Sequence, residues 1–204
     1  MRSASQGLEA LREALAAEGG AVVEVLVDRS EPADPRGTPG PPQIAAEGPR
    51  ARGREREYEL LLEMILEGAR LHYGRGSVVA PGDPDLALLL GDQLYALGLS
   101  RLAALGDLEA TAELADVISL VAQSNAAADP VLADAVWQAG AAAVGWGASA
   151  ELQAAKSLAR AQDPAAASAL LRAAAAVRSP SGEARDASLD VDDMVPESFN
   201  SGSV

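Results

Sequence analysis

The sequence predicts an all-α protein, and three observations support this. Alanine and leucine are abundant whereas aromatic residues make up 3% of the chain, and alanine and leucine favour helices while strands favour aromatic and β-branched residues. Leucines recur at helical spacing in several windows. Three Asp-Pro pairs, at 83–84, 129–130 and 163–164, are typical of helix starts. We therefore expect a bundle of antiparallel helices joined by short loops, in a chain of 204 residues that suffices for one domain.

Residues 1–28 form the expected N-terminal helical segment. Residues 5–18 carry leucines at helical spacing behind a serine that can cap, and a glycine pair ends the pattern. The following run, Ala21–Val27, is the only stretch rich in β-branched residues. It fits either a short strand or a second helix start.

Residues 29–56 are expected to be a flexible linker. Seven prolines and glycines fall between Pro32 and Pro42, a composition that favours polyproline-like or flexible chain over a helix or a buried core. Four arginines follow in alternation: Arg50, Arg52, Arg54 and Arg56. A solvated entrance to the next helix is a better interpretation of this basic patch than a phosphate site.

The helical body is expected over residues 57–178. Its first helix, over residues 57–71, carries a broad apolar face, with Glu59, Glu63, Glu67 and Arg70 on the opposite face. A glycine-rich turn over residues 72–77 ends it. The next helix begins at Asp83-Pro84 and continues through Leu105, with leucines in nearly every direction around its axis. A helix that is apolar all round is expected at the centre of a fold.

Three more helices complete the expected body. Asp107 caps one that ends near Asn125, and the Asp-Pro pairs open helices over residues 131–160 and 165–177. Small residues within residues 141–148 permit close approach of helices. Trp137 and Trp146 supply large packing areas that fit either a core or a subunit interface.

Residues 179–204 are acidic, rich in serine and poor in apolar residues, which is typical of a disordered tail. Within it, residues 190–199 interleave acids with Val191, Met194, Val195 and Phe199. This pattern fits a peptide that docks on a partner groove, although an inert solubilising tail is the simpler interpretation.

Composition excludes several classes of function. The net charge of −14 makes nonspecific binding to nucleic acid or to anionic lipid a poor expectation. Without cysteine there is no thiolate nucleophile and no zinc site built on sulfur. No signal-peptide pattern opens the sequence, and the most apolar windows carry charged residues, so we expect a cytoplasmic protein without a membrane span.

Individual polar residues do not assemble into a predicted metal or catalytic site. His72, the only histidine, is expected to hydrogen-bond the end of its helix rather than to catalyse a reaction. The acids at 190, 192 and 193 lack the glycine and terminal glutamate of a calcium loop. Asp92 lies within the apolar helix and therefore needs a partner or a wet cleft; pairing with the backbone or with an arginine such as Arg75 is the favoured interpretation.

A resemblance adds a more specific expectation. The stretch Val78–Asp107, with the Gly91-Asp92 pair, resembles the segment of isoprenyl diphosphate synthases that carries a Gly-Asp pair on the helix after the first aspartate-rich motif. Residues 60–72 are similar to the helix that precedes that motif, and Arg75-Gly76 is similar to part of an Arg-Arg-Gly turn. The resemblance implies a part of the isoprenoid synthase fold.

The sequence departs from this family where magnesium would bind. Both aspartate-rich motifs are absent, and no carboxylate lies between His72 and Asp83. Without them nothing would neutralise a diphosphate leaving group. The chain is most similar to the non-catalytic small subunit of two-component heptaprenyl and hexaprenyl diphosphate synthases, which implies a regulatory role in isoprenoid synthesis for quinone side chains.

The resemblance also implies a partner and a set of contact residues. The partner would be a catalytic prenyl diphosphate synthase subunit, and we expect neither activity nor a cofactor in this chain alone, with magnesium entering only through that subunit. In this hypothesis Leu90, Leu94, Leu97 and Leu99 line either the subunit interface or the tunnel in which the product grows. The rival hypothesis is a helical adaptor unrelated to prenyl chemistry, which docks through residues 190–199.

Overall fold

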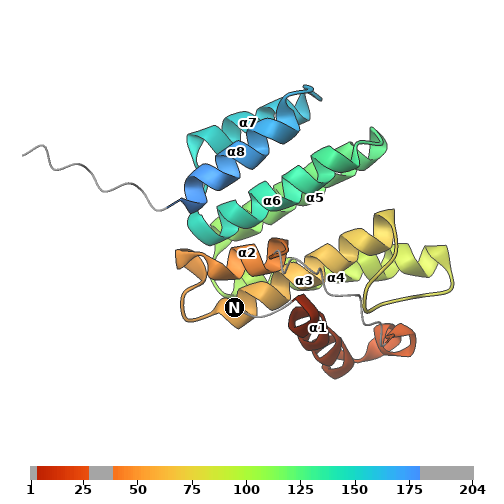
Figure 1. Cartoon of the computed structure of the whole chain (residues 1–204). Coiled ribbons are helices and arrows are strands. Elements are labelled where there is room, and N and C mark those ends of the chain that lie inside the picture. The colour runs from red at the N-terminus through yellow and green to blue at the C-terminus, as the bar shows by residue number, and fades with distance from the viewer. Residues whose placement is uncertain (1–3, 28–38, 180–204) are drawn as a thin grey trace, which may run out of the picture.

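The computed structural model describes residues 4–27 and 39–179, and these residues form an all-helical fold (Figure 1). The elements in chain order are α1 (Ala4–Glu18), η1 (Gly20–Val25, a 3-10 helix), α2 (Pro41–Glu47), η2 (Pro49–Ala51, also 3-10), α3 (Glu55–Tyr73), α4 (Pro84–Ala104), α5 (Leu108–Ala126), α6 (Pro130–Trp146), α7 (Ala150–Arg160) and α8 (Ala166–Arg178). The expected all-α class is therefore confirmed for the described residues. The tail over residues 180–204 lies outside them.

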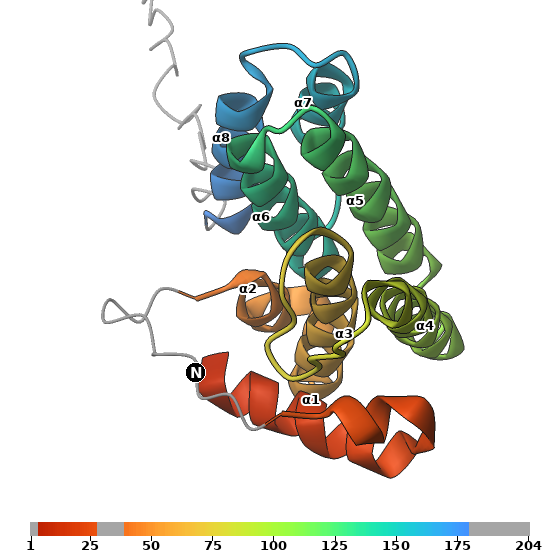
Figure 2. The ribbon, with the colours of Figure 1, turned by 90° about the vertical axis from the view of Figure 1, so that its right-hand side faces the viewer.

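Helix α6 is the central helix of the fold. It packs against α2, α5, α7 and α8 (Figure 2), and most of its residues are buried, many of them alanines. Small side chains allow four neighbours to approach one helix closely. Trp137 is buried on α6, and Trp146 lies half-buried at its end beneath the Arg178 guanidinium, 5.6 Å from the ring centroid.

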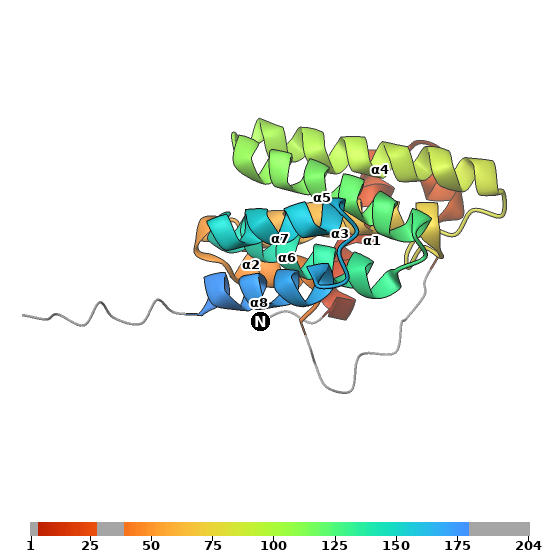
Figure 3. The ribbon, with the colours of Figure 1, turned by 90° about the horizontal axis from the view of Figure 1, so that it is seen from above.

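Helix α4 lies at the edge of the fold, so the expectation of a central position is wrong. It packs mainly along α3 and touches α5 near the chain reversal between them (Figure 3). Leu90 and Leu94 are buried, but Leu88 and Leu89 remain 45% and 66% exposed. Leucines around the whole axis show that a helix is hydrophobic. They do not determine its position, which depends on which other helices pack against it.

The second half of the expected linker is part of the folded protein, which corrects that prediction for residues 39–56. Prolines start α2 rather than prevent it, because a helix needs no N–H donor in its first turn. Ile44 and Ala45 of α2 are 2% and 0% exposed. A Cβ built on Gly145 would lie 2.7 Å from the Ala45 carbonyl oxygen, so glycine permits the close contact of α2 with α6. The first half of the expected linker, residues 29–38, lies outside the described residues.

Two further elements differ from expectation. The helix expected over residues 131–160 is two helices, because Gly147 adopts a φ of 99° and Ser149 accepts a hydrogen bond from the Leu152 N–H at 3.1 Å, which starts α7. The run Ala21–Val27 forms most of η1 and then an antiparallel bridge between Leu26 and Val79.

None of the described helices is long and apolar enough to cross a membrane.

Candidate functional site

The exposed side of α4 is the candidate functional site. We define the α4 outer face as Leu88, Leu89, Asp92, Ala96, Leu99 and Ala103. Residues 89, 92, 96, 99 and 103 follow one another at spacings of three and four, so they form one stripe along the helix. Leu99 is half-buried and the others are exposed. Two exposed leucines and two alanines thus surround one carboxylate on a surface that no described helix covers.

Glycines set the opposite, buried side of α4 against α3. A Cβ built on Gly91 would lie 2.8 Å from the His72 ring and 3.1 Å from the Gly68 carbonyl oxygen. Gly91 therefore holds the two helices close together, which gives the first residue of the Gly91-Asp92 pair a packing role. Asp92 follows on the solvent side of the same turn.

Asp92 lies beside His72 rather than beside Arg75, which corrects the partner expected from the sequence. The Asp92 Oδ1 is 3.1 Å from the His72 Nε2, and the Asp92 side chain is 72% exposed. The buried His72 Nε2 has no hydrogen-bond partner. The two atoms are therefore close to each other but are not aligned for a hydrogen bond. The contact becomes an ion pair only when the imidazole is protonated.

One aromatic ring of α4, that of Tyr95, packs against the His72 ring. The rings of His72 and Tyr95 stack with centroids 5.1 Å apart and an angle of 12° between their planes. The Tyr95 hydroxyl is buried without a hydrogen-bond partner, and burial raises the pKa of Tyr95 well above its ordinary value. Burial also raises the pKa of Tyr73. Neither phenol is thus prepared to act as a base.

The leucines expected at an interface or tunnel divide into two sets. Leu90 and Leu94 are 3% and 2% exposed in the protein core, on the side of α4 that packs on α3. Leu97 and Leu99 are half-buried at its margins. Leu99 lies on the same side of α4 as Leu88 and Leu89, about three turns further along the helix, and packs in part against the core. Hydropathy alone could not have separated these sets, since both contain leucine.

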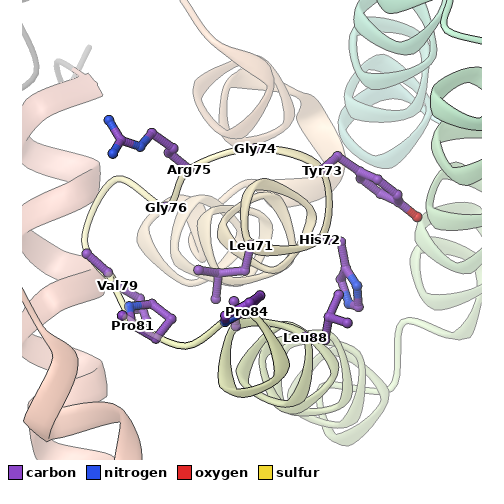
Figure 4. A pocket seen from close by; sticks show the side chains of 13 residues that line it. Leu71, His72, Tyr73, Gly74, Arg75, Gly76, Val79, Pro81, Pro84 and Leu88 are labelled. Atoms are coloured by element: carbon purple, nitrogen blue, oxygen red, sulfur yellow. The ribbon is translucent and has the colours of Figure 1, made fainter.

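A cavity of about 690 Å³ opens at the N-terminal end of α4. Figure 4 shows that the loop between α3 and α4 curves around Leu71 and Pro84. The side chains of Tyr73 and Arg75 point outward from this loop. The cavity lining combines prolines, glycines and leucines with three polar side chains, those of His72, Tyr73 and Arg75.

Glu67 holds the loop that surrounds this cavity. The Glu67 Oε1 accepts hydrogen bonds from the Val78 and Val79 N–H groups at 2.8 and 2.9 Å. Arg70 donates to its other oxygen at 3.2 Å. A carboxylate that accepts two backbone hydrogen bonds and one charged donor has most of its acceptor capacity satisfied.

Three glutamates on α3 are buried, although the sequence places them opposite the apolar face of that helix. Glu59, Glu63 and Glu67 are 3%, 2% and 0% exposed, because α1, α2 and the loop after α3 cover that side. The Gln43 amide donates to the Oε1 atoms of Glu59 and Glu63 at 3.1 and 3.2 Å. Burial raises the pKa of Glu63 to about 7, although the nearby Arg70 opposes this shift.

Within residues 4–27 and 39–179, no group of three histidine or acidic side chains is arranged to hold a metal ion. The arginine patch is partly used in structural pairs, since Arg50 contacts Asp107 and Glu109 at 2.8 and 2.7 Å. Helix α4, in contrast, presents an exposed and partly apolar surface.

Comparison of the chain with protein-family models, with curated proteins and with solved structures found no match.

Proposed function

We propose that this chain is a non-catalytic helical subunit that binds a partner protein through the α4 outer face. The observation that carries the proposal is the exposure of Leu88 and Leu89, at 45% and 66%, on a helix at the edge of the fold. Contiguous apolar side chains on a surface helix favour association, because contact with a partner removes them from water. Helices commonly dock through anchors at this spacing.

The proposed partner is the catalytic subunit of a two-component long-chain prenyl diphosphate synthase. Support comes from the resemblance over residues 60–72 and 78–107, and the helices α3 and α4 that these segments form pack along each other. The contact residues now proposed are Leu88, Leu89 and Leu99. Leu90 and Leu94 contribute indirectly, because they are buried in the core and anchor α4.

Co-expression with the catalytic subunit of a heptaprenyl diphosphate synthase tests this function. We expect the two chains to co-elute on a sizing column and the product chain length to change relative to the catalytic subunit alone. Leu89→Glu should abolish co-elution, because it places a charge in the contact. Leu171→Glu is the matched control, since Leu171 is 46% exposed on α8. Separate elution with unchanged product length would overturn the proposal.

The adaptor hypothesis predicts a different result. Its docking segment, residues 190–199, lies outside the described residues. A chain that ends at Ser179 should retain the partner if α4 forms the contact. Loss of the partner on this truncation, with retention in Leu89→Glu, would favour the adaptor.

A further inference from the structure

We propose that Asp92 determines partner specificity at the α4 outer face, by pairing with an arginine or lysine set within the apolar face of a partner helix. The inference rests on the proposed function, since it concerns the same surface. It adds the chemistry that the partner must supply.

The position of Asp92 places it inside any contact along α4. Leu89 precedes it by three residues and Ala96 follows it by four, and Leu99 and Ala103 continue the same stripe. Residues at these spacings meet a neighbouring helix when two helices pack lengthwise. A helix that covers Leu89 and Leu99 therefore also covers the carboxylate between them.

Covering Asp92 creates a need for a counter-charge. Its side chain is 72% exposed in this chain, so water solvates the carboxylate until a partner docks. Among the described residues, His72 is the only basic side chain within ion-pair distance, and its Nε2 is not aligned with the carboxylate. The adjacent leucine and alanine side chains have no hydrogen-bond donors. The nearby Tyr73 and Tyr95 phenols are neutral donors that carry no positive charge. An unpaired carboxylate removed from water is strongly unfavourable.

The charge of the surrounding surface favours a cation over a neutral donor. Asp85 is exposed one turn before Leu89, and Asp83 is exposed at the N-cap of α4. The single arginine of α4, Arg101, is already paired with Glu18 of α1. An approaching helix therefore meets a negative, partly apolar surface, and an arginine or lysine within its apolar face matches both properties.

The test measures the affinity of the full chain for the purified heptaprenyl synthase catalytic subunit. Asp92→Asn keeps the shape of the side chain and removes its charge, so we expect the dissociation constant to rise roughly thirtyfold or more. Asp92→Arg should weaken binding further, because it repels the partner's cation. Asp134→Asn, which removes an exposed carboxylate from α6, is the control and should bind like the unaltered chain. Thermal unfolding of each free variant verifies that the fold is retained.

The possible outcomes separate this inference from the proposed function. If Leu89→Glu abolishes binding while Asp92→Asn and Asp92→Arg bind as tightly as Asp134→Asn, the role of Asp92 is overturned and the proposed function stands. Tighter binding by Asp92→Arg would also overturn it. If the unaltered chain does not bind the catalytic subunit, the proposed function and this inference both fail.

Discussion

The amide of Gln43 donates a hydrogen bond to the Glu63 Oε1 at 3.2 Å, and this contact joins α2 to a buried row of carboxylates on α3. The same nitrogen donates to Glu59 at 3.1 Å. One neutral side chain thus supports two carboxylates. The second oxygen of Glu63 has no hydrogen-bond partner and lies 3.9 Å from the Arg70 Nη1. The stability of this part of the fold should therefore depend on the protonation of Glu63.

The pKa of Glu63 predicts a pH-dependent stability. Burial raises this pKa from 4.5 to about 7 in the folded chain, so the folded state binds more protons than the unfolded state between these values. The free energy of unfolding should accordingly fall as the pH rises through this window. Glu63→Gln removes the charge and keeps an oxygen for Gln43. We expect it to stabilise the protein at pH 8 by about 1–3 kcal/mol and to have little effect near pH 4.

Urea unfolding of both proteins between pH 4 and pH 8 measures this difference. In the difference between the two proteins, the contributions of the other titrating groups to the pH dependence of stability cancel. A Glu63→Gln variant that is less stable than the unaltered chain at pH 8 would contradict the prediction.

Glu67 should control the loop between α3 and α4. In Glu67→Ala the Val78 and Val79 N–H groups lose the acceptor that holds them at 2.8 and 2.9 Å. Leaving buried donors without partners costs about 1–3 kcal/mol per group. Hydrogen exchange at these two amides should accelerate. Amides in the middle of α6 should change only as far as the free energy of global unfolding changes. Unchanged exchange at Val78 and Val79 would show that Glu67 does not hold the loop.

The contact between α2 and α6 should depend on Gly145. In Gly145→Ala the new Cβ would lie 2.7 Å from the Ala45 carbonyl oxygen and 3.2 Å from the Gly48 Cα, so two backbones must separate. We expect a destabilisation of roughly 1–3 kcal/mol, the usual cost of overpacking. Gly82→Ala is the control, because a Cβ there meets no atom within 4 Å. Thermal unfolding compares the two, and equal melting temperatures would contradict the close contact.

Lys156, the only lysine of the chain, should be essential for the packing of α7 on α5. Its side chain is 2% exposed, and its Nζ pairs with Glu113 and lies 3.1 Å from the Asp116 Oδ2. Lys156→Met removes the buried cation between these carboxylates, although Glu113 keeps its hydrogen bond from Gln153 and Asp116 keeps its pair with Arg160. Breaking a buried pair from one side costs about 3–5 kcal/mol. Because both carboxylates keep these contacts and some exposure, we expect a smaller loss of about 2–3 kcal/mol.

Arg160→Met provides the comparison for Lys156→Met. Arg160 also pairs with Asp116, but its side chain is 46% exposed. Exposed pairs contribute less than about 1 kcal/mol. Denaturant unfolding that ranks Arg160→Met as the more destabilising substitution would contradict a structural role for Lys156.

Local patterns predicted the helices well and their surroundings poorly. The Asp-Pro pairs at 83–84 and 129–130 start α4 and α6 as expected, because capping is decided within one turn. The proline- and glycine-rich composition around Pro41 predicts a linker, yet buried Ile44 and Ala45 stabilise a helix there. The row of glutamates on α3 carried no local signal of burial, since Gln43 and Gly7, which pack against Glu63, come from elsewhere in the chain.

The candidate site was predicted in part. The sequence singled out Asp92 as a carboxylate within an apolar helix, and the structure places it on the solvent side beside His72. Leu90 and Leu94 carried the same sequence signal as Leu88 and Leu89, but the first pair is buried and the second exposed. Only the position of α3 distinguishes them.

By itself the sequence determined the all-α class, the starts of α4 and α6 and the lack of cysteine chemistry, because these follow from composition and from contacts within one or two turns. The tertiary structure alone decided that α6 is central and α4 peripheral, that the glutamates of α3 are buried, and that two leucines beside Asp92 face solvent. The physical reason is that the burial of a side chain depends on two elements, the one that carries it and the one that packs against it. A side chain leaves water only when another part of the chain covers it.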